Sequence, residues 1–248
     1  MIVLKTNTEL EHMKKACRIS AEALNVAEER IRPGITTKEI NGAIHEYIVK
    51  CGAKPSFLGL YGFPASACIS INDVVIHGIP SDYRLAEGDI VSVDVGACFE
   101  GYHGDNAYTF PVGQISEENQ TLLRVTQESL YKGIEAAVLG HRVGDISHAV
   151  QSHVTPYGFG IVRQFVGHGV GKALHEDPEV PNFGSAGRGP RLAEGMTIAI
   201  EPMITLEGDG VTIDGDKWTT RTKSGKTAAH FEHTIAITKD GPVILTKR

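Results

Sequence analysis

The sequence predicts an α+β fold, in which helices flank an antiparallel sheet built from two related halves. Two observations predict it. Residues 89–110 alternate β-branched and small residues on both sides of a Glu100-Gly101 turn, which is typical of a β-hairpin. The segment 85–94, which leads into this hairpin, also recurs later in the chain, at 192–201.

The repeat extends beyond a single strand. Leu85-Ala-Glu-Gly-Asp-Ile-Val-Ser-Val-Asp94 aligns with Leu192-Ala-Glu-Gly-Met-Thr-Ile-Ala-Ile-Glu201 at an offset of 107, and the first four residues are identical. At an offset of 106, a predicted helix also repeats: Ile40, Ala43, Ile44 and Gly52 match Ile146, Ala149, Val150 and Gly158. Common residues match by chance, but a near-constant offset in two separate segments favours duplication.

Length and composition are those of an ordinary globular protein. The chain has 248 residues, of which 41% are hydrophobic and 22% charged. Together with the repeat, this predicts one domain over 1–248, with halves of approximately 1–112 and 113–248.

Charge and cysteine usage restrict the partners. A net charge of -6 provides no basic field for nucleic acid. No run approaches the roughly 18 apolar residues of a membrane span, and the first residues do not resemble a signal peptide. Cys17, Cys51, Cys68 and Cys98 form no Cys-x-x-Cys pair, which indicates free thiols in a reducing compartment. We expect a cytoplasmic protein that binds neither nucleic acid nor membranes, and by default a monomer.

Helix signals come early in the chain. Thr8-Glu-Leu-Glu11 reads as a capping box that starts a first helix, which ends near Pro33. Thr36-Thr-Lys-Glu39 starts a second helix, which ends at Gly52. The later expected elements are a strand at 67–71, helices at 116–140 and about 145–154, a strand at 160–166, a loop at 176–191, and strands at 197–204 and 229–238.

The hairpin carries an unusual pair of carboxylates. Because side chains alternate along a strand, Val91, Val93 and Val95 share one face and Asp94 lies on the other. Asp105 then lies opposite Asp94 or one diagonal step away, within roughly 4.5–8 Å. Two like charges on a buried face repel each other, and a divalent cation would resolve the conflict. The alternative is a charge at a sheet edge, or a carboxylate paired with a buried arginine.

The second half supplies two more carboxylates. Glu201 shares a strand face with Thr197 and Ala199, and Glu232 lies among similarly small residues. If the halves pack about a pseudo-two-fold axis, Asp94, Asp105, Glu201 and Glu232 converge. Two divalent cations would neutralise four carboxylates, and cations about 3.5–4 Å apart are typical of hydrolytic sites.

Histidines extend the candidate site. His168 lies in Gly167-His-Gly-Val-Gly, where glycines let the backbone approach an ion closely. The alternative is a packed or surface histidine. We interpret His77 and His175 as groups that hydrogen-bond the substrate. Carboxylate and imidazole ligands suit Fe, Mn, Co or Zn.

These motifs together resemble a known family. The residues concerned are Ile76-His77-Gly-Ile-Pro80, Val93-Asp94, His103-Gly-Asp105, Gly167-His168-Gly-Val-Gly-x-x-x-His175-Glu, Ala199-Ile-Glu201-Pro202 and Glu232-His-Thr234. In order and spacing, they resemble a type I methionine aminopeptidase along essentially the whole chain. The resemblance implies a single catalytic domain with the pita-bread fold, an antiparallel sheet flanked by helices in two pseudo-symmetric halves. It also implies removal of the initiator methionine from new polypeptides whose second residue is small.

The resemblance also assigns roles to residues. It implies that two divalent metal ions are held by Asp94, Asp105, His168, Glu201 and Glu232, with Asp105 and Glu232 bridging. It places His77 and His175 beside the substrate as catalytic groups, and makes Glu201 the proton relay. The methionine pocket would comprise Phe57, Leu60, Phe63, Cys68, Leu174 and Trp218. Related bacterial enzymes often carry Cys, Tyr and Phe in place of Phe57, Leu60 and Leu174, but the pocket stays apolar. The alternative for these pocket residues is simple core packing.

The implied partners are the N-terminal segments of nascent polypeptides, and any ribosome contact would use the globular surface. Two other functions stay open. A proline-specific peptidase of the same fold would use the same five ligands, although such enzymes usually carry a further N-terminal domain. A non-catalytic binding module would keep the fold, but such relatives lose ligands, whereas all five are present in this sequence.

Overall fold

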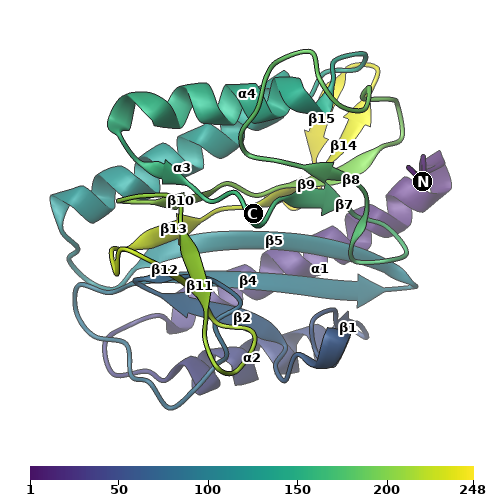
Figure 1. The fold of residues 1–248 in the computed structure, drawn as a ribbon. Helices are drawn as coiled ribbons and strands as arrows, with labels where there is room; N and C mark the ends of the chain where they lie inside the picture. Colours follow the sequence, from purple (N-terminus) through teal and green to yellow (C-terminus); the bar gives the residue numbers. More distant parts are fainter.

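A computed structural model describes residues 1–248 as four α-helices and fifteen strands (Figure 1). Every strand pair in it is antiparallel. The expected α+β class is therefore confirmed. None of the helices has a stretch both long and apolar enough to cross a membrane.

The helices are α1 (Asn7–Arg30), α2 (Thr37–Lys50), α3 (Glu117–Ala136) and α4 (Val143–Val154), with 3-10 turns at Leu60–Gly62 and Thr155–Tyr157. The strands are β1 (Lys54–Pro55), β2 (Ala67–Ile71), β3 (Val74–Ile76), β4 (Ile90–Phe99), β5 (Tyr102–Pro111), β6 (Gly160–Ile161), β7 (Gly167–Gly169), β8 (Glu176–Val180), β9 (Thr197–Ile200), β10 (Met203–Thr205), β11 (Val211–Ile213), β12 (Thr220–Thr222), β13 (Ala228–His230), β14 (His233–Thr238) and β15 (Gly241–Ile244).

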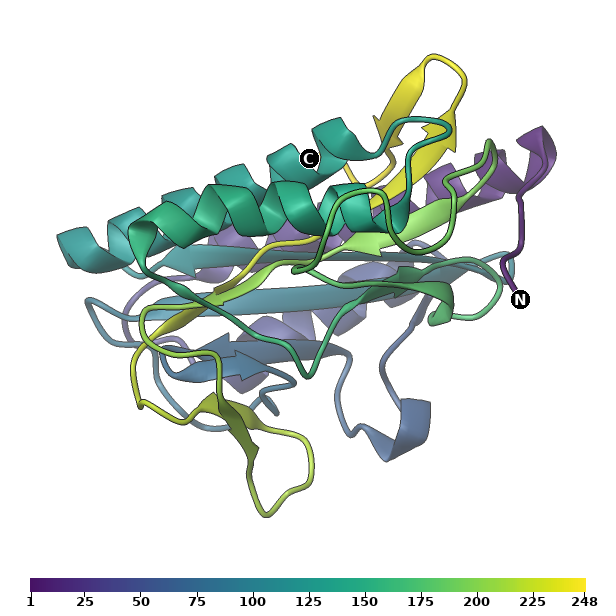
Figure 2. The same ribbon diagram turned by 45° about the horizontal axis from the view of Figure 1, so that its top comes forward.

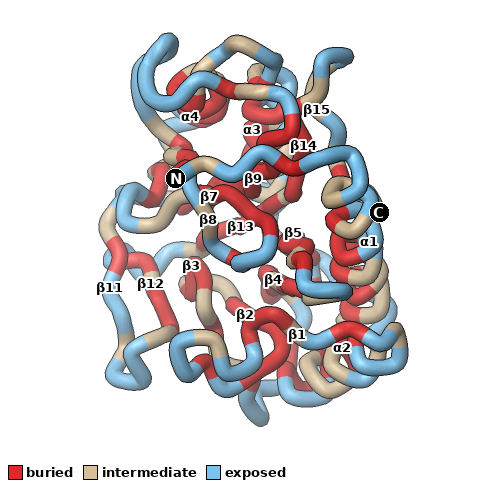
Figure 3. Tube along the Cα trace, turned by 90° about the vertical axis from the view of Figure 1, so that its right-hand side faces the viewer, coloured by how far each residue is buried: buried red, intermediate tan, exposed pale blue.

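The strands form four sheets. One holds β1, β4 and β2, with β5 also paired to β4, and a five-stranded sheet runs in the order β15-β14-β9-β7-β8. Two three-stranded sheets, β13-β10-β6 and β11-β12-β3, complete the fold. In the view of Figure 3, α1 and the β11–β12 hairpin lie at opposite sides of the molecule, with β4, β5 and β13 between them.

The two largest hydrophobic cores mainly follow the two halves. In the first, Val91, Val93 and Val95 of β4 pack with residues of α1 and α2, including Leu24 and Ile44. In the second, residues of α3 and α4 pack on β9, β10, β13 and β14 (Figure 2). The alternation expected along 91–95 is thus observed, and it leaves Asp94 on the face away from α1 and α2.

Capping residues start the first two helices. Thr36 and Glu39 form the expected capping box at α2, because Glu39 N–H donates to the Thr36 hydroxyl and the Glu39 carboxylate accepts from Thr36 N–H. The box at α1 uses Thr6 and Glu9, so the prediction at Thr8 was two residues late. The sequence contains two overlapping Thr-x-x-Glu patterns, and the earlier one caps the helix.

The offset of the sequence repeat recurs in backbone hydrogen bonds. Gly34 N–H donates to Leu85 O at 2.7 Å, and Gly140 N–H donates to Leu192 O at 3.0 Å. Two further pairs of contacts are related in the same way: Leu85 N–H to Ile35 O with Leu192 N–H to His141 O, and the bridge Thr36–Arg84 with the bridge Arg142–Arg191. These matching backbone contacts show the two pseudo-symmetric halves of the expected fold.

Three strand predictions and one loop prediction need correction. The strand expected at 160–166 covers only Gly160–Ile161, and the loop expected at 176–191 begins with β8, which pairs with β7. The strand expected at 197–204 is broken at Glu201-Pro202, where proline has no N–H for the ladder. The strand expected at 229–238 is broken at Phe231-Glu232. There, Glu232 N–H donates across the molecule to Ala107 O at 2.9 Å, a long-range contact that strand propensity does not contain.

Helix α1 packs closely against β5, so a side chain added at their contact should destabilise the fold. A Cβ at Gly104 would lie 2.4 Å from Cys17 Cα, so backbone has to move in the Gly104→Ala variant. We expect the free energy of unfolding in urea to fall by about 1–3 kcal/mol. Gly42→Ala is the control, because its Cβ meets nothing within 4 Å on α2, and it should be neutral or stabilising by up to about 1 kcal/mol. Equal effects of both substitutions on the free energy of unfolding would contradict the close packing of Gly104 against α1.

Candidate active site

All the site residues predicted from the sequence line one cavity of about 790 Å³. They are Phe57, Leu60, Phe63, Cys68, His77, Asp94, Asp105, His168, Leu174, His175, Glu201, Trp218 and Glu232. Both sequence halves contribute, so the cavity exists only once the halves have packed together.

The β4–β5 hairpin presents two carboxylates to this cavity. Asp94 pairs with Ala107 and Asp105 pairs with Gly96, so the two aspartates are diagonal neighbours, the second of the two expected registers. Thr234 holds the backbone of Asp105 from the other half: its hydroxyl donates to Asp105 O at 2.7 Å and accepts from Asp105 N–H at 3.2 Å.

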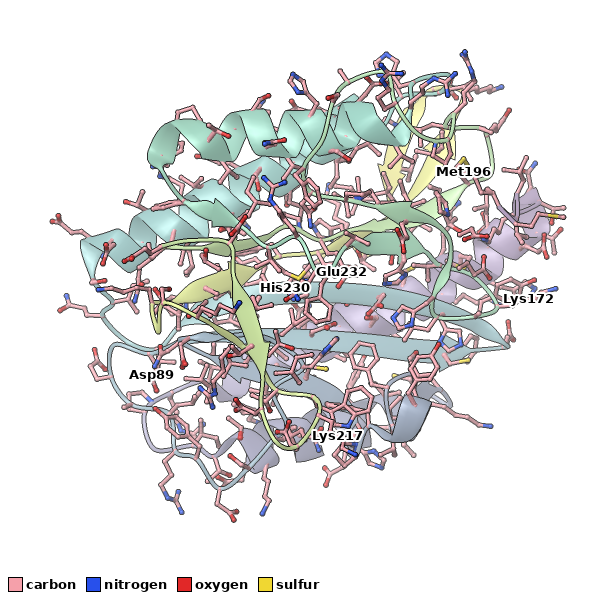
Figure 4. The ribbon with its side chains drawn as sticks, viewed as in Figure 1. Asp89, Lys172, Met196, Lys217, His230 and Glu232 are labelled. Carbon is pink, nitrogen blue, oxygen red and sulfur yellow. The ribbon has the colours of Figure 1, made fainter.

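The glutamates come from the two strand breaks of the second half. Glu232 N–H donates to Ala107 O on β5, which brings Glu232 beside the hairpin. In Figure 4, Glu232 and His230 are labelled next to each other in the middle of the molecule, along β5. The backbone carbonyl of Glu201 accepts from the Asn182 side-chain amide at 3.0 Å. Interrupting a strand turns each glutamate out of the ladder and into the cavity.

The four carboxyls lie together without a lysine or arginine beside them, with Asp105, Glu201 and Glu232 buried and Asp94 half-buried. Burial raises the pKa of Asp105 to about 7. Burial, and then the charges of Asp94 and Asp105, raise the pKa of Glu201 well above its usual value, and burial likewise raises the pKa of Glu232. Three of their oxygens have no hydrogen-bond partner: Asp94 Oδ1, Asp105 Oδ1 and Glu232 Oε1. No lysine or arginine lines the cavity, so the alternative of a buried arginine partner is excluded.

His168 faces this cluster with a lone pair. Its Nδ1 lies 2.8 Å from the carbonyl of Gly169, and only an N–H can bind a carbonyl, so Nδ1 carries the proton. In the neutral ring, Nε2 is then an acceptor. It lies 3.4 Å from Glu201 Oε1 and 3.7 Å from Asp105 Oδ2. Burial lowers the pKa of His168 to about 4, so the imidazole is neutral near pH 7 and keeps this lone pair free to bind a cation.

A divalent cation fits this arrangement. Ligand atoms of Asp105, His168 and Glu232 lie within 4.8 Å of one another, and a histidine whose other nitrogen binds a backbone carbonyl is typical of metal sites. The unpartnered oxygens of Asp94 and Asp105 and the lone pair of His168 can all serve as ligands to a cation. Oxygen and imidazole donors suit Mn, Fe, Co or Zn.

His77 and His175 line the cavity beside the cluster. The His175 ring lies 4.5 Å from the His168 ring, and the His77 ring packs against Phe165 and Trp218. Burial lowers the pKa of His77 to about 4 and also lowers the pKa of His175. Each imidazole is therefore neutral near pH 7 and has one donor nitrogen to offer a ligand.

The predicted pocket residues form an apolar end of the cavity. Phe57, Phe63, Cys68 and Leu174 are buried in one hydrophobic cluster, and Leu60 and Trp218 pack against it. The Phe63 and Trp218 rings meet edge to face at 5.1 Å. These residues thus pack together and also line the cavity, so the two interpretations made from the sequence are compatible.

Sequence reasoning assigned no role to His230, yet it lies beside a candidate ligand. Its Nε2 is 3.6 Å from Glu201 Oε2, buried and without a hydrogen-bond partner. The sequence contained one signal that His230 lies at the site. It stands two residues before Glu232, and alternation along a strand puts both side chains on one face.

Other cavity residues gave no signal in the sequence. Tyr61 stacks on His175 with ring centroids 6.2 Å apart, and Met1 and Val3 line the mouth of the cavity. The N-terminal residues are far from every motif along the chain, so only the packed structure shows that they adjoin the site.

Comparison with known proteins agrees with this geometry. The model of metallopeptidase family M24 matches residues 11–239. A methionine aminopeptidase of Clostridium perfringens is 54% identical over 246 residues, covering 99% of each chain. The chain belongs to metallopeptidase family M24. The resemblance to methionine aminopeptidases seen in the motifs is confirmed.

Solved structures of family M24 proteins show the same fold. The crystal structure of a methionine aminopeptidase from Thermotoga maritima superposes with a TM-score of 0.98 at 46% identity, covering 100% of both chains. A prolidase from Pyrococcus furiosus superposes with a TM-score of 0.81 at 28% identity, covering 99% of this chain and 66% of that one. The expected pita-bread fold is confirmed, and family membership implies that the chain binds divalent metal.

Metal binding should stabilise the folded chain, since an unfolded chain has no assembled cluster. We expect Mn²⁺ or Co²⁺ at 100 times its Kd to add about 2.7 kcal/mol to metal-stripped protein, a rise in Tm of roughly 5–10 °C. Glu232→Ala should lower both this rise and the metal content found by elemental analysis. Glu135→Ala, at an exposed site on α3, is the control. A Tm that does not respond to metal would contradict the cluster as a metal site.

Proposed function

We propose that this protein removes the N-terminal methionine from newly made polypeptides by hydrolysis, preferring a small second residue. The observation that carries the proposal is the cluster of candidate metal ligands, in which the His168 lone pair lies beside Glu201 and Asp105, inside a cavity with an apolar end. The names of the full-length relatives from Clostridium perfringens and Thermotoga maritima support the same activity.

The proposed substrate orientation follows from the polarity of the cavity. The thioether side chain of methionine enters the apolar end, between Phe63, Leu174 and Trp218. Sulfur is weakly polar and contacts aromatic rings favourably, so an aromatic-lined pocket suits it. The free amine of the methionine then faces the carboxylate end of the cavity, and the scissile carbonyl lies beside His175.

Asp94, Asp105, His168, Glu201 and Glu232 are the residues that would hold the metal. When bound, two divalent cations (Co, Mn, Fe or Zn) would supply Lewis-acid chemistry, polarising the carbonyl and making a water more acidic at neutral pH. Their charge would also let the carboxylates ionise despite their burial.

The remaining steps belong to side chains. Glu201 accepts a proton from the attacking water and passes it to the leaving amine. His175, neutral near pH 7, donates an N–H to the carbonyl oxygen as negative charge develops there, and His77 hydrogen-bonds the substrate. The cleaved bond lies between the carbonyl carbon of methionine and the nitrogen of the second residue, and water supplies one hydroxyl and one proton.

We also propose a domain organisation, partners and a location for the chain. The chain would act as one catalytic domain over 1–248, with halves of about 1–112 and 113–248, and as a monomer. Its partners would be the N-terminal segments of nascent polypeptides, with the ribosome contacted through the globular surface. Its four cysteines are all free thiols, which supports a cytoplasmic location.

Loss of the His175 donor should mainly slow turnover. Removing a donor that acts on the transition state costs about 2.7–4 kcal/mol, so we expect His175→Ala to lower kcat for Met-Ala-Ser by roughly 100–1000-fold. Metal content should stay unchanged. His148→Ala, exposed on α4, is the matched control. Wild-type turnover by His175→Ala would show that its role is assigned wrongly.

A substrate panel separates the alternatives. The metal-loaded protein should release methionine from Met-Ala-Ser much faster than it cleaves an X-Pro dipeptide such as Ala-Pro, and chelation should abolish both reactions. The opposite preference would favour a proline-specific peptidase. If metal binds but no free-amine peptide is cleaved, the protein is a binding module.

A further inference from the structure

We infer that Lys5 is a positioning residue for His175, acting through Glu176; this rests on the role proposed above for His175. Lys5 Nζ lies 2.6 Å from Glu176 Oε2, with the two side chains only 3% and 12% exposed. In every other lysine or arginine ion pair at least one side chain is more than 25% exposed. No sequence motif pointed to Lys5.

Glu176 is attached to the segment that carries His175. It follows His175 directly, at the start of β8, and its second carboxylate oxygen, Oε1, accepts from Ala173 N–H at 3.2 Å. A Cβ at Gly171 would lie 2.4 Å from the same oxygen, so the carboxylate is seated against the 171–174 loop. Glu176 therefore ties both ends of the turn that delivers His175 to the cavity. Lys172, labelled at the edge of the molecule in Figure 4, lies at the exposed tip of this loop.

The rest of this loop is also tied to rigid strands. His103 N–H on β5 donates to Gly171 O at 2.9 Å, and Gly171 N–H donates to Ala173 O at 3.0 Å. Together with the Glu176 contact, these bonds leave little freedom between His168 and His175. Among the groups that make these bonds to the loop, only the Glu176 carboxylate is charged. Lys5 is the one cation paired with it.

Lys5 itself is held by the second half of the molecule. Its N–H donates to Gly195 O at 2.8 Å, and its ammonium also donates to Val3 O at 3.2 Å. A Cβ at Gly195 would lie 2.6 Å from Lys5 O, so the two backbones are in close contact. A lysine anchored in this way presents a fixed charge to Glu176. If it is removed, a nearly buried carboxylate loses its partner and must recruit water or move, and the loop moves with it.

A displaced His175 should affect chemistry more than binding, because its donor acts on the developing charge of the carbonyl. We expect Lys5→Met to lower kcat for Met-Ala-Ser about 10- to 100-fold, with KM and metal content nearly unchanged. Lys5→Arg restores a positive charge and should recover most of the lost kcat. Lys14→Met, an exposed lysine on α1 paired with Glu11, should behave as wild type.

A double-mutant cycle with His175→Ala distinguishes positioning from a general loss of stability. If Lys5 acts through His175, adding Lys5→Met to His175→Ala should leave kcat within about threefold of His175→Ala alone. Wild-type kcat in Lys5→Met, or the same fold-loss in both backgrounds, would overturn the inference. If Lys5→Met does not fold, Glu176→Gln removes the charge with little change in shape and takes its place in the cycle.

An activity-independent measurement separates this inference from the proposed function. The side-chain NMR resonances of His175, assigned by their absence in His175→Ala, should shift in Lys5→Met and stay unchanged in Lys14→Met. Unchanged resonances in Lys5→Met would overturn the positioning role. A wild-type protein that fails to release methionine would instead overturn the proposed function, whatever the NMR result.

Discussion

Four carboxyls and a histidine lone pair, gathered in one cavity with no lysine or arginine beside them, are the constraint on which the rest of this structure depends. Desolvation raises the pKa of each carboxyl, and Asp105 Oδ1 and Glu232 Oε1 remain without hydrogen-bond partners. Such a cluster costs several kcal/mol in a protein that cannot compensate it. Positive charge from outside the chain resolves this cost, which agrees with membership of a metallopeptidase family.

The duplicated architecture makes the convergence possible. One half presents Asp94 and Asp105 on an uninterrupted hairpin, whose regular alternation sends valines to the core and aspartates to the cavity. The other half presents Glu201 and Glu232 at strand breaks. The bond between Glu232 N–H and Ala107 O joins the halves beside the cluster, so the interface between the halves and the candidate metal site form together.

Around the cluster, neighbouring groups set protonation and orientation. The Gly169 carbonyl selects the tautomer of His168, and burial keeps His77 and His175 neutral near pH 7. The inferred role of Lys5 extends this principle to a residue that lies outside the cavity. A hydrolytic site needs donors fixed within fractions of an ångström, and loops such as 171–174 reach that precision only when their carbonyls and carboxylates are bound on every side.

Sequence alone predicted the α+β class, the two halves and the convergence of four carboxylates, because alternation and an offset of about 106–107 depend only on local order along the chain. The apolar pocket residues were predicted only through the resemblance to a known family. The tertiary structure decided that Asp105 is diagonal to Asp94, that both glutamates lie at strand breaks, and that β8 replaces part of an expected loop. It alone brought His230 beside Glu201 and Lys5 beside Glu176. These features depend on contacts between residues far apart in the chain, and neither propensity nor periodicity carries information about such contacts.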